Sequence, residues 1–247
     1  QFLGDMLQSV GPSVALGRDA TMLREILDKT AERVSNDLKG QPEVQAELLS
    51  TIGITYLELG DWPKAEAAHR EALRRRKGLF GETNEFVASS LYNLGSVLSL
   101  KPDFAEAESL QRTALTIRQN LFGDNHPDVA DSFAGLAHAL NDRGKMAEAE
   151  AAYREALRIK RALPDRRDQD LADLLNEFVT HLVTKRNFAE AESLSREAVA
   201  LGRKLPGNGN PTLATSLLRL AWALEDQGRP AEAEPFCREA VAMRRKL

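Results

Sequence analysis

Four histidines are the side chains in this sequence best suited to binding a metal or moving a proton: His69, His126, His138 and His181. No two of them are three or four residues apart, the spacing at which one helix presents two ligands on one face. His138 and His181 belong to neighbouring helices of the repeat described below and can approach one another, but two histidines alone do not make a metal site. His126 stands directly before Pro127, where we expect it to cap a helix. The histidines therefore predict no bound metal.

The other reactive groups are explained by architecture. Cys237 is the only cysteine, which excludes an internal disulfide and a multi-cysteine metal site. It shares a repeat position with His69, so we expect a small buried side chain and not a nucleophile. Glu148 and Glu150 form an acid pair that recurs in several units, whereas an active site needs one copy. The turn Gly207-Asn208-Gly209 lacks the Lys-Ser/Thr of a phosphate-binding loop. We therefore expect no catalytic residue, no cofactor and no enzyme activity.

The composition describes a chain that can bury a core. Hydrophobic residues make up 43% and charged residues 28%, which excludes disorder by composition. The net charge of −4 gives no reason to expect nucleic acid or an anionic membrane as partner. No run approaches the length of a membrane span, and the first residues lack the basic region of a signal peptide, which favours a cytoplasmic location. Because the chain starts at Gln1 and not at Met, we expect a fragment of a longer protein.

An internal repeat organises the chain. The phrase Ala105-Glu106-Ala107-Glu108 returns 42 residues later as Ala147-Glu148-Ala149-Glu150, and again at 189–192 and 231–234; the first copy, 63–66, is degenerate. Three further columns keep this interval: Ala72, Ala114, Ala156, Ala198 and Ala240; Leu79, Leu121, Leu163, Leu205 and Leu247; and Gly53, Gly95, Ala137, Val179 and Ala221, where Val179 breaks the rule of small residues. Four columns in one register over five copies predict stacked units that bury a continuous core.

Each unit is expected to form two helices, A and B. In the third unit the apolar spacing predicts helix A over about 127–141 and helix B over about 146–163. The helix ends carry the expected residues: Asn84, His126, Asp168 and Asn210 as N-caps, Pro127 and Pro211 as first helical residues, Gly60, Gly144 and Gly228 between A and B, and Gly81 and Gly123 after B. Pro102 and Arg186 replace the A–B glycine in units two and four.

The pattern Gly53-x-x-Tyr56 and Ala149-x-x-x-Tyr153, with the Ala156 column, resembles the tetratricopeptide signature. A period of 42 and the linking phrase 121–130, Leu-Phe-Gly-Asp-Asn-His-Pro-Asp-Val-Ala, resemble the kinesin-light-chain class, which is widespread in bacterial multidomain proteins. The resemblance implies an all-α, right-handed α-α superhelical solenoid whose A helices line a concave side. HEAT, armadillo and WD40 repeats also have periods in the forties. WD40 needs four strands per unit, and HEAT and armadillo units do not rest on such an alanine-rich crossing.

The predicted organisation is an N-terminal segment, 1–40, with a capping helix over about 20–38, followed by repeats 41–83, 84–125, 126–167, 168–209 and 210–247. Residues 17–28 resemble the segment that joins a bacterial serine/threonine kinase to its repeat array. The last helix ends at Leu247 without a polar helix to cover it, so either the natural chain continues or this face pairs with another copy.

A second stripe on each A helix, distinct from the core stripe, is the predicted peptide-binding groove. Its residues are small, polar or acidic, with two large aromatics: Glu47, Ser50, Thr51, Ile54 and Glu58; Ser89, Tyr92, Asn93, Ser96 and Leu100; Asp131, Ala134, Gly135, His138 and Asp142; Asp173, Asn176, Glu177, Thr180 and Thr184; Thr215, Leu218, Arg219, Trp222 and Asp226. Acidic side chains outnumber the single arginine, so the stripe predicts a basic or neutral partner.

The sequence thus favours a scaffold that binds a protein or peptide in the groove. Two alternatives stay open: a regulatory module of a larger bacterial signalling enzyme such as a serine/threonine kinase, and a self-assembling structural rod. We expect the chain to bind neither nucleic acid nor a membrane directly.

Overall fold

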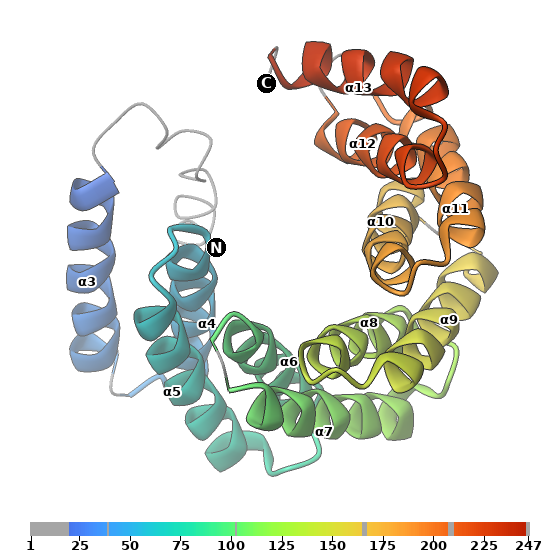
Figure 1. Cartoon of the computed structure of the whole chain (residues 1–247). Coiled ribbons are helices and arrows are strands. Elements are labelled where there is room, and N and C mark those ends of the chain that lie inside the picture. The colour runs from blue at the N-terminus through green and yellow to red at the C-terminus, as the bar shows by residue number, and fades with distance from the viewer. Residues whose placement is uncertain (1–19, 39, 102, 165–166, 207–209, 246–247) are drawn as a thin grey trace. The chain divides into compact units, whose positions relative to one another are not determined.

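Helices account for all regular structure in the described part of the chain. The computed structural model describes residues 20–38, 40–101, 103–164, 167–206 and 210–245, which hold eleven α-helices and no strand. The chain divides into two units, 1–123 and 124–247. The first contains α3 (Ala20–Asp37), α4 (Pro42–Glu58), α5 (Trp62–Phe80), α6 (Glu85–Ser99) and α7 (Phe104–Phe122). The second contains α8 (Pro127–Asp142), α9 (Met146–Ala162), α10 (Asp168–Thr184), α11 (Phe188–Gly202), α12 (Pro211–Glu225) and α13 (Pro230–Arg244) (Figure 1).

Consecutive helices pack as pairs, α4 with α5, α6 with α7, and so on to α12 with α13. The all-α solenoid of tetratricopeptide-type pairs expected from the 42-residue repeat is confirmed. Helices α8 and α9 end within one or two residues of their predicted bounds. No helix in the described ranges is long and apolar enough to cross a membrane.

Most predicted helix ends are confirmed. The side chains of Asn84, His126 and Asn210 accept hydrogen bonds from backbone N–H groups of the first turn. The prediction for Asp168 is wrong by one position, because Asp168 is the first residue of α10 and Arg167 precedes it as N-cap. The turn glycines adopt positive φ: Gly60, Gly81, Gly123, Gly144 and Gly228.

Two of the turns between helices A and B lack the glycine. Arg186 replaces the glycine in the α10–α11 turn and still adopts φ 60°, a conformation that costs a residue with a Cβ about 1–2 kcal/mol. Pro102, the Gly207-Asn208-Gly209 turn, Leu247 and residues 1–19, including the start of the kinase-like segment, lie outside the described residues.

The helices of a pair cross where their side chains are smallest. Two alanine columns of the B helices are completely buried: Ala65, Ala107, Ala149, Ala191 and Ala233, and Ala72, Ala114, Ala156, Ala198 and Ala240. On the A helix, a Cβ on Gly53 would lie 2.7 Å from the His69 ring, and a Cβ on Gly95 would lie 2.8 Å from the Gln111 amide. The glycines are therefore required by the large side chain that each one faces.

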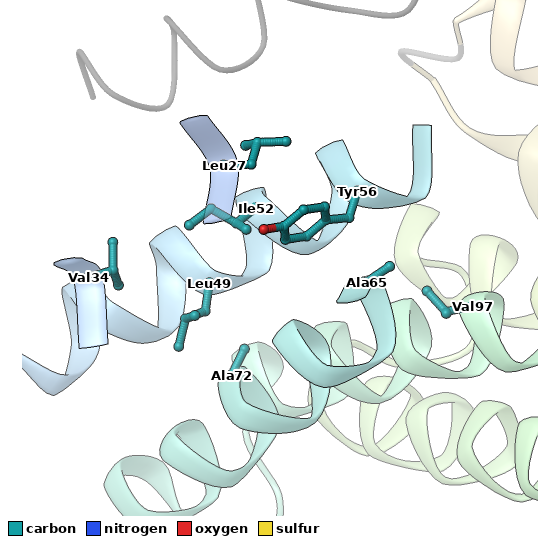
Figure 2. Close-up of a cluster of buried hydrophobic side chains, with 8 residues drawn as sticks. All are labelled: Leu27, Val34, Leu49, Ile52, Tyr56, Ala65, Ala72 and Val97. Atoms are coloured by element: carbon teal, nitrogen blue, oxygen red, sulfur yellow. The ribbon is translucent and has the colours of Figure 1, made fainter. Parts of the chain in front are cut away.

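In the first unit, α3 packs on α4 through apolar side chains. Leu27 and Val34 of α3 join Leu49, Ile52 and Tyr56 of α4 in one buried cluster (Figure 2). The Tyr56 hydroxyl donates a hydrogen bond of 2.6 Å to Asp28, and Lys64 of α5 lies 2.7 Å from the same carboxylate. A hydrogen bond and an ion pair thus add to the apolar contacts between α3 and the first helix pair.

Exposed ion pairs link successive B helices at a constant interval of 36 residues. They are Arg70–Glu106, Arg154–Glu190, Arg161–Glu197 and Arg203–Glu239, with N–O distances of 2.6 to 3.0 Å. Because their side chains are largely exposed, each pair contributes at most about 1 kcal/mol. Because the interval is constant, these ion pairs favour one alignment of neighbouring repeats, and they contribute little to overall stability.

Candidate functional site

The second unit carries a pocket of about 810 Å³ on its A helices. Its walls come from α8, α10 and α12, and Met146 and Tyr153 of the α9 helix complete them. Nine residues of the predicted stripe line it: His138, Asp142, Asp173, Asn176, Glu177, Thr180, Thr184, Thr215 and Arg219.

Helix α10 forms the middle of the pocket because its two faces differ. Asp173, Asn176, Glu177, Thr180 and Thr184 follow helical spacing and all line the pocket. The opposite face of the helix is apolar and buried: Leu171, Ala172, Leu174, Leu175, Phe178, Val179 and Leu182. Burial of this apolar face holds the polar face toward the pocket.

Asn176 is the unusual residue of this face. It is only 5% exposed, yet neither its Oδ1 nor its Nδ2 has a hydrogen-bond partner among the described residues. Leaving a buried polar group unpaired costs about 1–3 kcal/mol, and native proteins rarely do so. A primary amide offers a donor and an acceptor together, which is the complement of a peptide unit.

A hydrogen-bonded cluster stands beside Asn176. Nε2 of His138 lies 3.1 Å from a Glu177 carboxylate oxygen, and its Nδ1 lies 3.4 Å from the Tyr153 hydroxyl. Burial lowers the pKa of His138, but the hydrogen bond that its ring donates to Glu177 and the charges of Glu177 and Asp142 outweigh this effect, so the pKa of His138 is raised. Tyr153 also packs against Phe178, with ring centroids 5.3 Å apart. The cluster fixes the Glu177 carboxylate at the pocket wall.

Three carboxylates, Asp142, Asp173 and Glu177, give one part of the pocket a negative charge. Burial raises the pKa of the half-buried Asp173, and partial desolvation also raises the pKa of the exposed Asp142. The Thr212 hydroxyl donates a hydrogen bond of 2.8 Å to Asp173 and partly offsets this effect. A cationic group entering the pocket would replace the lost solvation.

Arg219 of α12 is the basic member of the pocket wall. Its guanidinium lies over the ring of Trp222, 4.7 Å from the centroid, and its Nε is buried without a partner. The pKa of Arg219 is lowered by burial and by the charge of Arg244. Trp222 itself is 46% exposed, so the stacked pair presents an aromatic edge at the surface.

Other stripe residues of the second unit lie elsewhere. Asp131 pairs with Lys160 at 2.6 Å and lines a separate pocket of about 310 Å³ between α8, α9 and α10. Its charge is therefore already compensated. Ala134 and Leu218 are half-buried, Gly135 is buried, and Asp226 is exposed.

The stripe residues of the first unit vary in exposure. Glu47, Ile54, Glu58 and Leu100 are exposed, Ser50 is buried, and Thr51, Ser89, Tyr92, Asn93 and Ser96 are half-buried. Tyr92 packs against the buried cluster of Val87 and Leu91 beneath the Arg118 guanidinium, so it does have a place in the core. Asn93 donates a hydrogen bond of 3.5 Å to Ser50, unlike Asn176.

Six pocket residues were absent from the predicted stripe or assigned to the scaffold: Asn141, Met146, Tyr153, His181, Pro211 and Thr212. Nδ1 of His181 lies 2.6 Å from Oδ1 of Asn141. The rings of His138 and His181 both pack against the ring of Tyr153, with centroid distances of 5.8 and 5.7 Å, so Tyr153 is the common neighbour of the two histidines that were expected to approach one another. Cys237 is half-buried and not fully buried as expected, although partial burial does raise its thiol pKa. Sequence spacing identifies the A-helix face that lines the pocket, but it does not identify the side chains outside that face that also line it.

The chain belongs to the tetratricopeptide repeat family, whose model matches residues 44–107, 86–162 and 170–246. Its fold is similar to that of kinesin-light-chain-like repeat proteins, and tetratricopeptide arrays serve as protein-interaction scaffolds. No curated protein matches it by sequence.

Solved structures share this fold at low sequence identity. BtubC (BKLC) from P. vanneervenii is 20% identical, with 90% of this chain and 89% of that chain covered and a TM-score of 0.74. A putative kinesin light chain from Podosopora anserina with nearly identical repeats is 18% identical over 80% of this chain and 94% of its own, with a TM-score of 0.64. NprR in complex with its cognate peptide NprX is 16% identical over 98% of this chain and 67% of its own, with a TM-score of 0.63.

Proposed function

We propose that this chain binds an extended peptide segment of a partner protein in the α8–α10–α12 pocket of its second unit. The observation that carries the proposal is Asn176, a buried amide whose donor and acceptor both lack partners in a pocket of about 810 Å³. A peptide backbone would satisfy both atoms at once. The structural neighbour NprR, which was solved with a cognate peptide, supports this class of ligand.

The proposed partner is basic or neutral at the Asp142–Asp173–Glu177 end. These carboxylates line one pocket, and Asp173 and Glu177 are half-buried, so together they attract a cation. Because the pocket is open to solvent, charge should affect association rate and selectivity more than affinity. The stripe residues of the first unit are proposed as a further contact surface on that unit alone.

A charge-sorted set of peptides of equal length tests the proposal. Titration by calorimetry at low and moderate salt should rank basic and neutral peptides above acidic ones, with weaker binding of the basic members at higher salt. Asn176→Ala should weaken binding of all of them by about tenfold, the value of one or two hydrogen bonds. Asn120→Ala, an identical change at an exposed site on α7, is the control and should have no effect.

Equal binding by Asn176→Ala and the unchanged chain would refute the proposed site. Tighter binding of acidic than of basic peptides would refute the proposed polarity while leaving the site in place.

A further inference from the structure

Arg219 shares its pocket with three carboxylates and pairs with none of them. Within the described residues its contacts are the Trp222 ring and the charge of Arg244, which repels it. Lys160 shows the usual alternative, since this buried lysine lies 2.6 Å from Asp131. A partly buried guanidinium without an acid is costly, because lost hydration is not replaced.

The carboxylates and the guanidinium come from different helices. Asp142 ends α8, Asp173 and Glu177 belong to α10, and Arg219 belongs to α12. Burial raises the pKa of the two aspartates and lowers the pKa of Arg219. His138 partly offsets the rise for Asp142 and Lys160 partly offsets it for Asp173, but the charge of Arg219 contributes to neither shift. The pocket wall therefore carries a guanidinium and three carboxylates, and no ion pair joins the guanidinium to any of the three.

We propose that the ligand of this pocket is bipolar: a peptide whose cationic group lies against Asp142, Asp173 and Glu177 and whose carboxylate pairs with Arg219. The proposal rests on the proposed function, in which Asn176 binds the peptide backbone between these two charges. A guanidinium binds a carboxylate through two parallel hydrogen bonds, and its Nε is one of the donors suited to that arrangement. Stacking on Trp222 restricts the guanidinium plane and reduces the entropy lost on pairing.

The carboxylate can belong to an acidic side chain or to a peptide C-terminus, and the experiment separates these sources. The ligands are acetylated, amidated peptides in which lysine and glutamate are separated by one to four neutral residues. Matched peptides carry glutamine in place of the glutamate or of the lysine. A last set lacks glutamate but keeps a free C-terminal carboxylate.

Binding is measured by calorimetry with the full chain. The emission of Trp222, followed in a Trp62→Phe background so that one tryptophan remains, reports on the Arg219 end of the pocket. At the best spacing, replacing glutamate by glutamine should weaken binding about tenfold. In Arg219→Gln this preference should disappear while the preference for lysine remains.

Two further variants and a control sharpen the result. Arg219→Lys should keep a reduced preference for glutamate, because the charge remains and the planar donor set does not. Asp173→Asn combined with Glu177→Gln should lose the preference for lysine and keep that for glutamate. Arg238→Gln changes an exposed arginine of α13 in the same unit and should leave every preference unchanged.

The outcomes separate the two proposals. If lysine peptides bind through Asn176 but glutamate and glutamine peptides bind equally, or if Arg219→Gln keeps the preference for glutamate, the bipolar ligand is refuted and the peptide site stands. If no peptide binds, both fall. If only peptides with a free C-terminus gain affinity through Arg219, the bipolar ligand holds and its carboxylate is the terminal one.

Discussion

Replacing Asn176 by leucine should make the protein more stable and should weaken peptide binding by about tenfold, because the same hydrogen bonds are lost. Asn176 is 5% exposed and its amide has no partner, so the folded state bears the cost of desolvating an unpaired polar group. That cost is about 1–3 kcal/mol. Leucine has a similar size and occurs 42 residues later at the matching position, Leu218, so the helix and its surroundings tolerate it.

The expected gain in the free energy of unfolding is about 1–2 kcal/mol. It is smaller than the full cost of the unpaired amide because part of the leucine side chain would face a pocket that is open to solvent. Urea denaturation followed by far-ultraviolet circular dichroism should show a midpoint higher by about 0.5–1 M. Because repeat arrays need not unfold in one step, the slope of the transition is compared as well.

Asn120→Leu is the matched control, because Asn120 is exposed on α7; its free energy of unfolding should change by no more than about 0.5 kcal/mol. If Asn176→Leu destabilises the protein by 1 kcal/mol or more, the amide has a partner in the folded state and the reasoning is wrong. If it stabilises the protein without loss of peptide binding, the amide is unpaired but unrelated to the ligand.

Three further predictions concern the scaffold. Burial and the charge of Arg76 lower the pKa of His69 from its ordinary 6.5 to about 4, so the unfolded chain binds a proton first as the pH falls. The free energy of unfolding should therefore drop by up to about 3 kcal/mol between pH 6.5 and pH 4, and His69→Gln, which introduces the side chain of the next repeat, should remove this part of the pH dependence in urea titrations. Gly53→Ala should destabilise by about 1–2 kcal/mol because its Cβ would meet the His69 ring at 2.7 Å, whereas Gly78→Ala, with free space around it, should stabilise by about 0.5–1 kcal/mol; equal midpoints would contradict the assigned crossing. Arg186→Gly should raise the free energy of unfolding by about 1 kcal/mol by relieving φ 60°, and a loss of stability would show that the contact of Arg186 with the Phe188 ring matters more than the strain.

The fold was predictable because it depends on residues that every repeat must have. A crossing residue such as Ala149 is small in all five copies, since a larger side chain would separate the helices at that point. Val179 appeared to break this rule, but the B-helix position that holds Tyr153 in the preceding unit holds the small Ser195 in this one. The space at the crossing limits the combined size of the two facing side chains, one from helix A and one from helix B. The residues at one repeat position, taken alone, could therefore not reveal this limit.

The site was predictable in part. Helical spacing placed Asp173, Asn176 and Glu177 on one face, and they do line one pocket. Spacing could not show that Asp131 would be neutralised by Lys160, because that pairing depends on how α8 and α9 pack. Nor could it show which polar side chains would lack partners, since hydrogen bonding is decided by atoms from several helices.

The positions that differ between repeats identify the site better than those that agree. The helix position of Asn176 holds Ser50, Tyr92, Ala134 and Leu218 in the other units, so stacking does not require an asparagine there. Any of the apolar alternatives would avoid an unpaired amide. The same holds for Arg219, whose position is occupied by Thr51, Asn93, Gly135 and Glu177 elsewhere. We therefore infer that a side chain which the architecture does not need, and which costs stability at its position, is kept because a ligand pairs with it. The stability gain expected for Asn176→Leu and the loss of glutamate preference expected for Arg219→Gln both test whether these side chains are kept for a ligand and not for stability.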